Sequence, residues 1–134
     1  MPLNPVNQAA LDQLNKLVLA KADAQLSLRE HASKLRKEAK KAGKLNDFAK
    51  RDALNLEAAK ISNQAIALNQ QNLRLFSTRN KILNSESLAD HTGELRDVAD
   101  QAEVATEQIE DVAKAIEQTA ALITFIIKFA GLVL

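Results

Sequence analysis

The last third of the chain carries an unbroken heptad pattern that continues into an apolar C-terminus. Two series of residues spaced by seven run together along it: Leu88, Leu95, Ala102, Ile109, Ile116, Ile123 and Ala130, and His91, Val98, Ala105, Val112, Thr119, Ile126 and Val133. This spacing keeps a mostly apolar seam on one side of a helix, as packing against other helices requires. The pattern therefore predicts one long helix over residues 86–134.

The remaining composition favours long helices. The chain of 134 residues contains only 3 Gly and 2 Pro, and Ala, Leu, Lys, Glu and Gln are abundant, all of them good helix formers. Gly43 is a natural helix end, and Asn46 or Asp47, and then Ser85, are suited to cap the helices that follow. We therefore expect a single all-α domain over 1–134, in which helices over 5–42, 47–83 and 86–134 form an antiparallel coiled-coil-like bundle.

The second predicted helix is apolar on two sides. Its main seam, which is expected to hold the bundle and neighbouring subunits together, consists of Leu54, Ile61, Leu68, Leu75 and Ile82. A second line on roughly the opposite side consists of Ala59, Ile66 and Leu73. A helix that is apolar on two sides is usually sandwiched. Either a homo- or hetero-oligomer covers the second line, or this helix is the covered centre of a monomer.

The net charge of +1 conceals two blocks of opposite sign. Residues 29–51 are mostly basic, while residues 86–117 hold ten acids and only two cations, Arg96 and Lys114. Short turns make consecutive helices antiparallel, so the third helix should run parallel to the first and bring its tail to the Gly43 turn. An apolar tip inside a basic ring suits an anionic membrane. The residues expected to contact lipid headgroups are Lys34, Arg36, Lys37, Lys40, Lys41, Lys44, Lys50 and Arg51.

Residues 120–134 are apolar at nearly every position, and Lys128 is their only charge. As a helix this segment reaches about 22 Å, short of the ~30 Å hydrocarbon core of a bilayer. It suits an interfacial anchor, or a pore-lining helix whose polar stripe of Glu117, Thr124 and Lys128 faces a lumen. In a soluble protein, the tail must instead be covered by folding back or by a partner. The residues predicted to enter the membrane are Leu122, Ile123, Phe125, Ile126, Ile127, Phe129, Leu132, Val133 and Leu134.

No pattern in the chain predicts catalysis, a metal site or a cofactor site. His31 and His91 lie far apart on apolar seams, without the spacing of a metal motif, and there is no Cys, phosphate-binding loop or nucleophile elbow. We therefore expect no enzyme activity and no small-molecule substrate. Nucleic-acid binding is not expected either, because the chain has no Trp or Tyr and its acidic helix opposes a polyanion. No signal peptide is visible, which favours a cytoplasmic protein or export by a non-classical route.

These features predict a non-enzymatic, membrane-active helical protein that is first soluble, then oligomerises and inserts its C-terminal helix. The expected architecture resembles in style the long-helix pore-forming toxins and their small partner components, although no motif matches a family. The alternative is a structural coiled-coil subunit of a filament, secretion apparatus or granule coat, with the tail buried in the assembly. Liposome leakage distinguishes the two functions. In the first, Ile126→Asp is expected to abolish leakage and leave the soluble fold intact.

Overall fold

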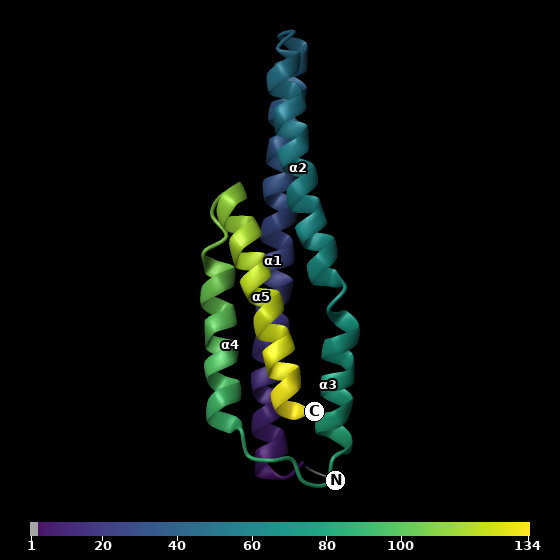
Figure 1. The fold of residues 1–134 in the computed structure, drawn as a ribbon, viewed down its shortest axis with the longest axis vertical. Helices are drawn as coiled ribbons and strands as arrows, with labels where there is room; N and C mark the ends of the chain where they lie inside the picture. Colours follow the sequence, from purple (N-terminus) through teal and green to yellow (C-terminus); the bar gives the residue numbers. More distant parts are fainter. Residues whose placement is uncertain (1–2) are drawn as a thin grey trace.

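The longest helix, α1, runs the whole length of the molecule, and every other element packs along it (Figure 1). The computed structural model describes residues 3–134, and the regular structure in this range is entirely helical, as predicted. The helices are α1 (Pro5–Lys44), α2 (Phe48–Asn69), α3 (Asn72–Asn84), α4 (Thr92–Glu107) and α5 (Val112–Val133).

Local sequence signals set the ends of α1 and α2. Asn4 caps α1, because its side-chain oxygen accepts a hydrogen bond of 2.8 Å from the backbone N–H of Asn7. The predicted turn near Gly43 is confirmed, and Asn46 makes the reversal with a φ of 60°, a conformation that Asn tolerates better than most residues. Asp47 then caps α2, as predicted, by accepting a hydrogen bond of 3.2 Å from the Lys50 N–H.

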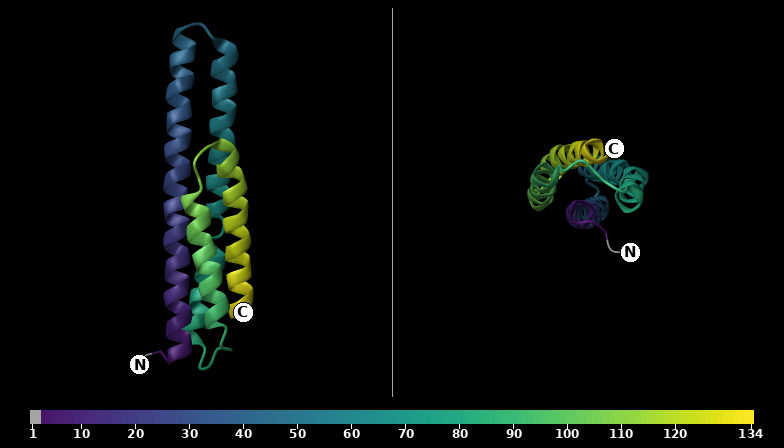
Figure 2. Two further views of the ribbon diagram at one scale, coloured as in Figure 1. Left: turned by 90° about the vertical axis from the view of Figure 1, so that its left-hand side faces the viewer. Right: turned by 90° about the horizontal axis from the view of Figure 1, so that it is seen from below.

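Four helical columns form the bundle (Figure 2). α2 and α3 descend beside α1 as one column that is interrupted at Gln70 and Gln71, α4 rises beside α1, and α5 descends between α4 and the α2–α3 column. The α2–α3 column and α4 therefore stand at opposite corners, as the view from below shows (Figure 2). Beyond the level of the α4–α5 turn, α1 and α2 continue alone as a projecting two-helix hairpin (Figure 1).

The prediction of three helices was wrong, because residues 86–134 form two antiparallel helices rather than one. α4 starts at Thr92 rather than after Ser85, and the chain turns back between Glu107 and Val112. Asp111 caps α5 by accepting a hydrogen bond of 2.8 Å from the Lys114 N–H. The turn places the apolar faces of both helices in one core, which a straight helix beside a two-helix hairpin would leave partly in water. Buried residues of α4 and α5 include Leu95, Val98, Ala102, Ala115, Leu122, Ile126 and Phe129.

The turn at 108–111 also overturns the predicted position of the tail. α5 runs away from the Gly43 turn, so its C-terminal end lies beside the α3–α4 connection, near the N-terminal end of α1 (Figure 1). In this structure the apolar C-terminal end of α5 and the basic turn near Gly43 thus stand at opposite ends of the molecule. The prediction assumed a continuous helix, and the reversal of α5 exchanges its two ends.

Of the two apolar sides of the second predicted helix, one is buried and the other is exposed. Of the predicted oligomer seam, Ile61, Leu68, Leu75 and Ile82 are buried inside the bundle and Leu54 is half-buried. The second line faces outward, where Ile66 is 57% and Leu73 is 74% exposed. The inner seam therefore serves the core of this chain, and the outer line is the surface available to a neighbour.

Lys21 introduces a charge into the apolar face of α1. Its residue surface is only 5% exposed, its Nζ donates a hydrogen bond of 3.0 Å to the Gln25 side chain, and burial lowers its pKa. At pH values between the lowered pKa and the ordinary one, the unfolded chain binds more protons than the folded chain. The stability of the protein therefore rises with pH over that range.

We expect Lys21→Met to increase the free energy of unfolding by about 1 kcal/mol at pH 7, because an apolar side chain of similar length replaces a buried charge. The variant should also lose the rise in stability at alkaline pH. Urea unfolding at pH 7 and near pH 10 measures both effects. A variant less stable than the parent at pH 7 would show that the charge of Lys21 is better solvated than its burial implies.

Candidate functional site

The tip of the projecting hairpin combines exposed apolar side chains with cations. Leu45, in the turn, is 81% exposed, and Phe48, which opens α2, is 50% exposed. The Arg51 guanidinium lies 4.8 Å from the centre of the Phe48 ring and donates a hydrogen bond of 3.0 Å to the Asp52 carboxylate. An arginine over a phenyl face is a cation–π contact, and it leaves the ring edge free to contact other apolar material.

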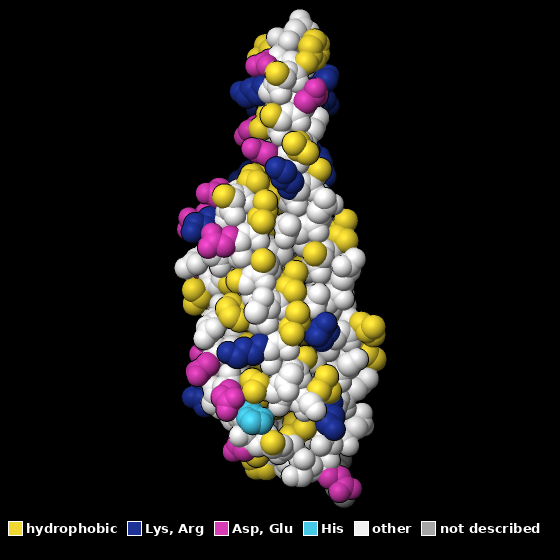
Figure 3. Space-filling view, in the orientation of Figure 1, with side chains coloured by type: hydrophobic (Ala, Val, Ile, Leu, Met, Phe, Trp, Pro, Cys, Tyr) yellow, Lys and Arg dark blue, Asp and Glu magenta, His cyan; other side chains and the backbone are white. Residues whose placement is uncertain are grey.

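All the residues predicted to contact headgroups lie on this hairpin. Between positions 34 and 51 there are eight cations and two acids, Glu38 and Asp47, which gives a net charge of +6. Among residues 3–134, the one ion pair that involves these cations is the contact of Arg51 with Asp52. Figure 3 shows Lys and Arg side chains on several sides of the projection and hydrophobic side chains at its end. The hairpin tip can therefore bind an anionic surface and place apolar side chains in it.

α5 is the second candidate element. Within the part of the chain that the structure describes, it is the one helix long and apolar enough to cross a membrane, a property that core helices of soluble bundles share. Of the residues predicted to enter a membrane, Leu122, Ile126, Phe129 and Val133 are buried, Ile123, Phe125 and Leu132 are half-buried, and Ile127 and Leu134 are exposed. The predicted polar stripe of Glu117, Thr124 and Lys128 faces outward to solvent. The helix thus places Leu122, Ile126, Phe129 and Val133 inside the bundle.

The burial of Ile126 changes one expectation. Its side chain is 0% exposed in the core, so Ile126→Asp would place a carboxylate in an apolar interior. The variant is not expected to keep the soluble fold, contrary to the sequence-based expectation. Ile127, which is 45% exposed on the same helix, is the position at which a charge tests membrane entry without damage to the core.

Two threonines on α5 behave differently. The Thr119 hydroxyl is buried without a hydrogen-bond partner among residues 3–134, an arrangement that costs free energy in a packed core. The Thr124 hydroxyl donates a hydrogen bond of 3.0 Å to the Ala120 carbonyl, one turn back on the helix. This bond satisfies the hydroxyl within the helix and makes it tolerable in an apolar medium.

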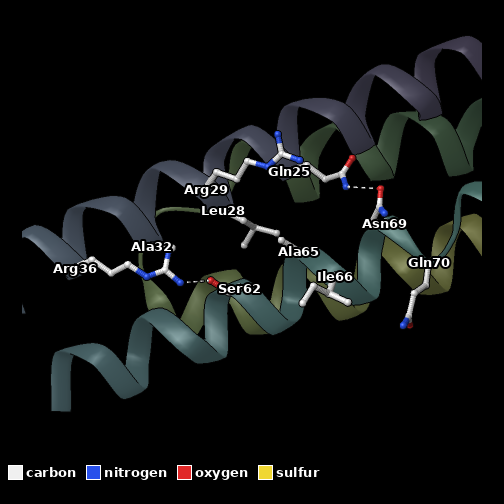
Figure 4. Close-up of a pocket in the computed structure, with 10 residues that line it drawn as sticks. All are labelled: Gln25, Leu28, Arg29, Ala32, Arg36, Ser62, Ala65, Ile66, Asn69 and Gln70. Atoms are coloured by element: carbon white, nitrogen blue, oxygen red, sulfur yellow. Dashed lines mark hydrogen bonds between the residues drawn. The ribbon is translucent and has the colours of Figure 1, made fainter. Parts of the chain in front are cut away.

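A cavity of about 360 Å³ opens between α1 and α2, where the hairpin leaves the bundle (Figure 4). Its apolar lining consists of Leu28, Ala32, Ala65 and Ile66. A hydrogen bond of 2.8 Å from Arg36 to the Ser62 hydroxyl crosses it. At its other end, Gln25 donates a hydrogen bond of 3.4 Å to the Asn69 side chain. None of the lining residues is an Asp, Glu, His or Cys, so the cavity holds no general base or strong nucleophile.

His31 lies within α1, beside the end of α4, and His91 lies at the start of α4. The Nε2 atom of His31 lies 3.2 Å from the carbonyl oxygen of Ile109, just beyond α4, and His91 directly precedes α4 with its Nδ1 3.4 Å from the Glu94 carboxylate. Among residues 3–134, no group of three His, Cys, Asp or Glu side chains is placed to hold a metal ion. The structure therefore brings the sequence-predicted residues together in two places, the hairpin tip and α5.

Sequence reasoning missed the apolar part of the tip. Leu45 and Phe48 lie in the segment KLNDFAK, where two apolar residues flank a turn signal among lysines. That combination, large apolar residues in a turn that could have been polar, was the available signal. Comparison of the chain with protein-family models, with curated proteins and with solved structures finds no match.

Proposed function

We propose that this chain is a non-enzymatic, membrane-active helical protein that docks through the hairpin tip, oligomerises, and inserts α5. The observation that carries the proposal is the tip itself. Leu45 and Phe48 stand exposed at the end of a projection with a net charge of +6 over residues 34–51. Cationic side chains attract anionic lipid headgroups, at about 1 kcal/mol for each one near the surface, while apolar side chains enter the interface.

The heptad pattern supports the insertion of α5, because it continues across the α4–α5 turn that interrupts the helix. In the folded-back state Ile116, a member of the pattern, is 36% exposed, and Ile123 is half-buried. There is no Gly or Pro between Glu107 and Val112, so the local sequence is compatible with a continuous helix as well. We propose that α4 and α5 straighten into one helix when the tip reaches a membrane.

The straightened helix would carry the apolar tail beyond the hairpin tip. Ile109 lies beside His31 of α1, and α4 runs parallel to α1, so Ile123 would lie level with Leu45, two heptads further along both helices. The residues after Ile123 would then extend about 17 Å beyond the tip, roughly half of the ~30 Å hydrocarbon core. Folding back thus stores the apolar tail in the soluble protein, and straightening delivers it beside the basic residues.

The structural coiled-coil subunit remains the alternative, because the outward line of α2 and α3 is suited to an assembly interface. In that function α5 stays in the core and the hairpin tip contacts protein. The two proposals differ in their dependence on anionic lipid. Membrane activity requires binding to anionic vesicles and dye release, whereas a purely structural subunit shows neither.

Replacement of Lys41, Lys44 and Lys50 by Gln tests the docking step. We expect binding to anionic vesicles to weaken by about 100-fold, since three surface cations contribute about 1 kcal/mol each. Vesicle co-sedimentation measures this change in binding. Salt at about 0.5 M should weaken vesicle binding by the parent protein to a similar extent, because it screens the charges. The matched control replaces by Gln three residues that are exposed on α3 and α5, away from the hairpin: Arg74, Lys81 and Lys114. Equal losses in both triple variants would mean that net charge, not the tip, drives binding.

A further inference from the structure

α3 presents a ridge of large apolar side chains to solvent. Leu73 is 74% and Phe76 is 61% exposed, and Ile66 on α2 continues the line at 57%. Figure 3 shows hydrophobic side chains standing out at the edge of the molecule where α3 lies. Several large apolar side chains in one line are more than the scattered exposure that any soluble protein has.

A groove of about 370 Å³ lies between α4 and α5, on the side of the molecule away from this ridge. Its lining is mostly apolar and includes Val104, which is 51% exposed, together with Ala105, Ala121 and Phe125. The carboxylate of Asp100 stands at its edge. The groove therefore offers an apolar floor of the kind that a Leu or Phe side chain fills, beside the carboxylate of Asp100 and three glutamine side chains.

The charges around ridge and groove are opposite. From position 58 to position 85 the chain has no Asp or Glu, and Arg74, Arg79 and Lys81 give α3 a charge of +3. α4 carries five acids and one cation, for a charge of −4. Asp97, one turn before Gln101 of the groove, is exposed. Complementary charge of this kind favours association of these two surfaces over pairing of like surfaces.

Ridge and groove also stand at the same height in the bundle. On one side of α1, Lys16 pairs with Asp100 at 2.9 Å, and the Thr106 hydroxyl donates to the Ala20 carbonyl at 3.0 Å. On another side, Asn7 bonds to the Ile82 carbonyl and Gln25 bonds to Asn69. Residues 73–79 lie between Asn69 and Ile82, the residues that make these two contacts. They therefore lie beside the same part of α1 as residues 97–104. Leu73 therefore lies level with Val104, Phe76 with Asp100, and Arg79 with Asp97.

We infer that the partner of these surfaces is a second copy of this chain, with Leu73 and Phe76 of one copy seated in the α4–α5 groove of the next. The copies stand side by side without an axial shift, and Arg79 of one faces Asp97 of the other. Because ridge and groove are different surfaces on different sides, the contact is heterologous and generates a ring or a filament. Since α5 forms one wall of the groove, this assembly holds α5 in the folded-back state.

This inference depends only on the folded-back structure, so it stands or fails separately from membrane insertion. The chain contains no Cys, which allows a clean cross-linking test in solution without lipid. A mixture of a Leu73→Cys chain and a Val104→Cys chain should form disulfide-linked dimers under mild oxidation. Either chain alone should form about tenfold fewer, because a heterologous contact never brings two equivalent positions together.

The control pairs Leu73→Cys with Leu26→Cys, which replaces a residue of α1 that is 56% exposed, and it should give only the background level. In sedimentation velocity, Arg79→Glu should weaken self-association by about tenfold, and Asp97→Arg in the same chain should restore it. Three results overturn the inference: cross-links of Leu73→Cys chains only with themselves, no cross-links above the Leu26→Cys background, or a chain that remains monomeric at high concentration.

Discussion

Glu110→Pro is expected to reduce dye release from anionic liposomes by about 100-fold, while Glu110→Ala leaves it equal or higher. Residue 110 lies between α4 and α5, outside both helices, and its backbone N–H donates no hydrogen bond within residues 3–134. Proline therefore removes no backbone hydrogen bond from the folded-back turn. In a straightened helix the same proline would sit in the interior, where it costs about 3 kcal/mol, a factor of about 100 in the equilibrium.

The comparison needs both variants, because each changes the same acidic side chain. Circular dichroism and thermal unfolding should show that both keep the helical content and stability of the parent, and Glu110→Pro should be as stable or slightly more stable. Both should also bind anionic vesicles equally, because the hairpin tip is unchanged. Equal leakage by the two variants would show that the turn does not straighten during membrane entry.

Phe129→Ala is expected to lower the free energy of unfolding by about 3–5 kcal/mol, the usual effect of removing a fully buried aromatic side chain. Phe129 is 0% exposed and is the largest fully buried side chain in the core of residues 3–134. For a chain of this size, the melting temperature should fall by roughly 10–20 °C. Urea or thermal unfolding in the absence of lipid measures the change.

Leu134→Ala provides the control at the C-terminal end of the same helix, because Leu134, which directly follows α5, is 68% exposed and its truncation should change stability by less than about 0.5 kcal/mol. The contrast reports whether α5 is part of the soluble core. A Phe129→Ala variant as stable as the parent would mean that α5 is already detached in solution.

The sequence predicted the all-α class, the bounds of α1 to within a few residues and the start of α2, because their signals are local. Gly43, Asn46 and Asp47 are turn and capping signals within five residues, and the turn between α1 and α2 forms where they predict it. The break between α2 and α3 at Gln70 and Gln71 was not predicted, since both residues keep nearly helical backbone angles and neither is a helix breaker. The two helices still descend as one column.

The reversal at 108–111 could not be predicted from local signals. The segment EQIED contains no Gly or Pro, and the heptad pattern runs through it. The Asp111 cap is a weak signal, because Asp occurs as often on the exposed face of a helix. What determines the reversal is a long-range effect, the burial of the apolar face of α5, including Leu122, Ile126 and Phe129, in the core that α5 forms with the other four helices. The predicted position of the tail was wrong for the same reason, because it assumed a continuous helix without this turn.

The candidate site shows the same division between local and long-range information. The basic hairpin residues were identified from their clustering in the sequence, and they all lie together on the projection. The apolar tip residues Leu45 and Phe48 were missed, because two apolar residues at a turn have no periodicity. The α4–α5 groove depends on the reversal, so no sequence pattern could have indicated it.

The most direct test of the central proposal follows α5 itself. An environment-sensitive fluorophore attached at Ile127→Cys occupies a position that is 45% exposed on the soluble bundle, in a chain without other cysteines. On addition of anionic vesicles, the proposed mechanism predicts a blue shift of the emission and quenching by lipids that carry a quencher in the acyl chain. An unchanged emission from protein that is bound to the vesicles would contradict it, because α5 would then remain folded back while the hairpin tip alone contacts the membrane.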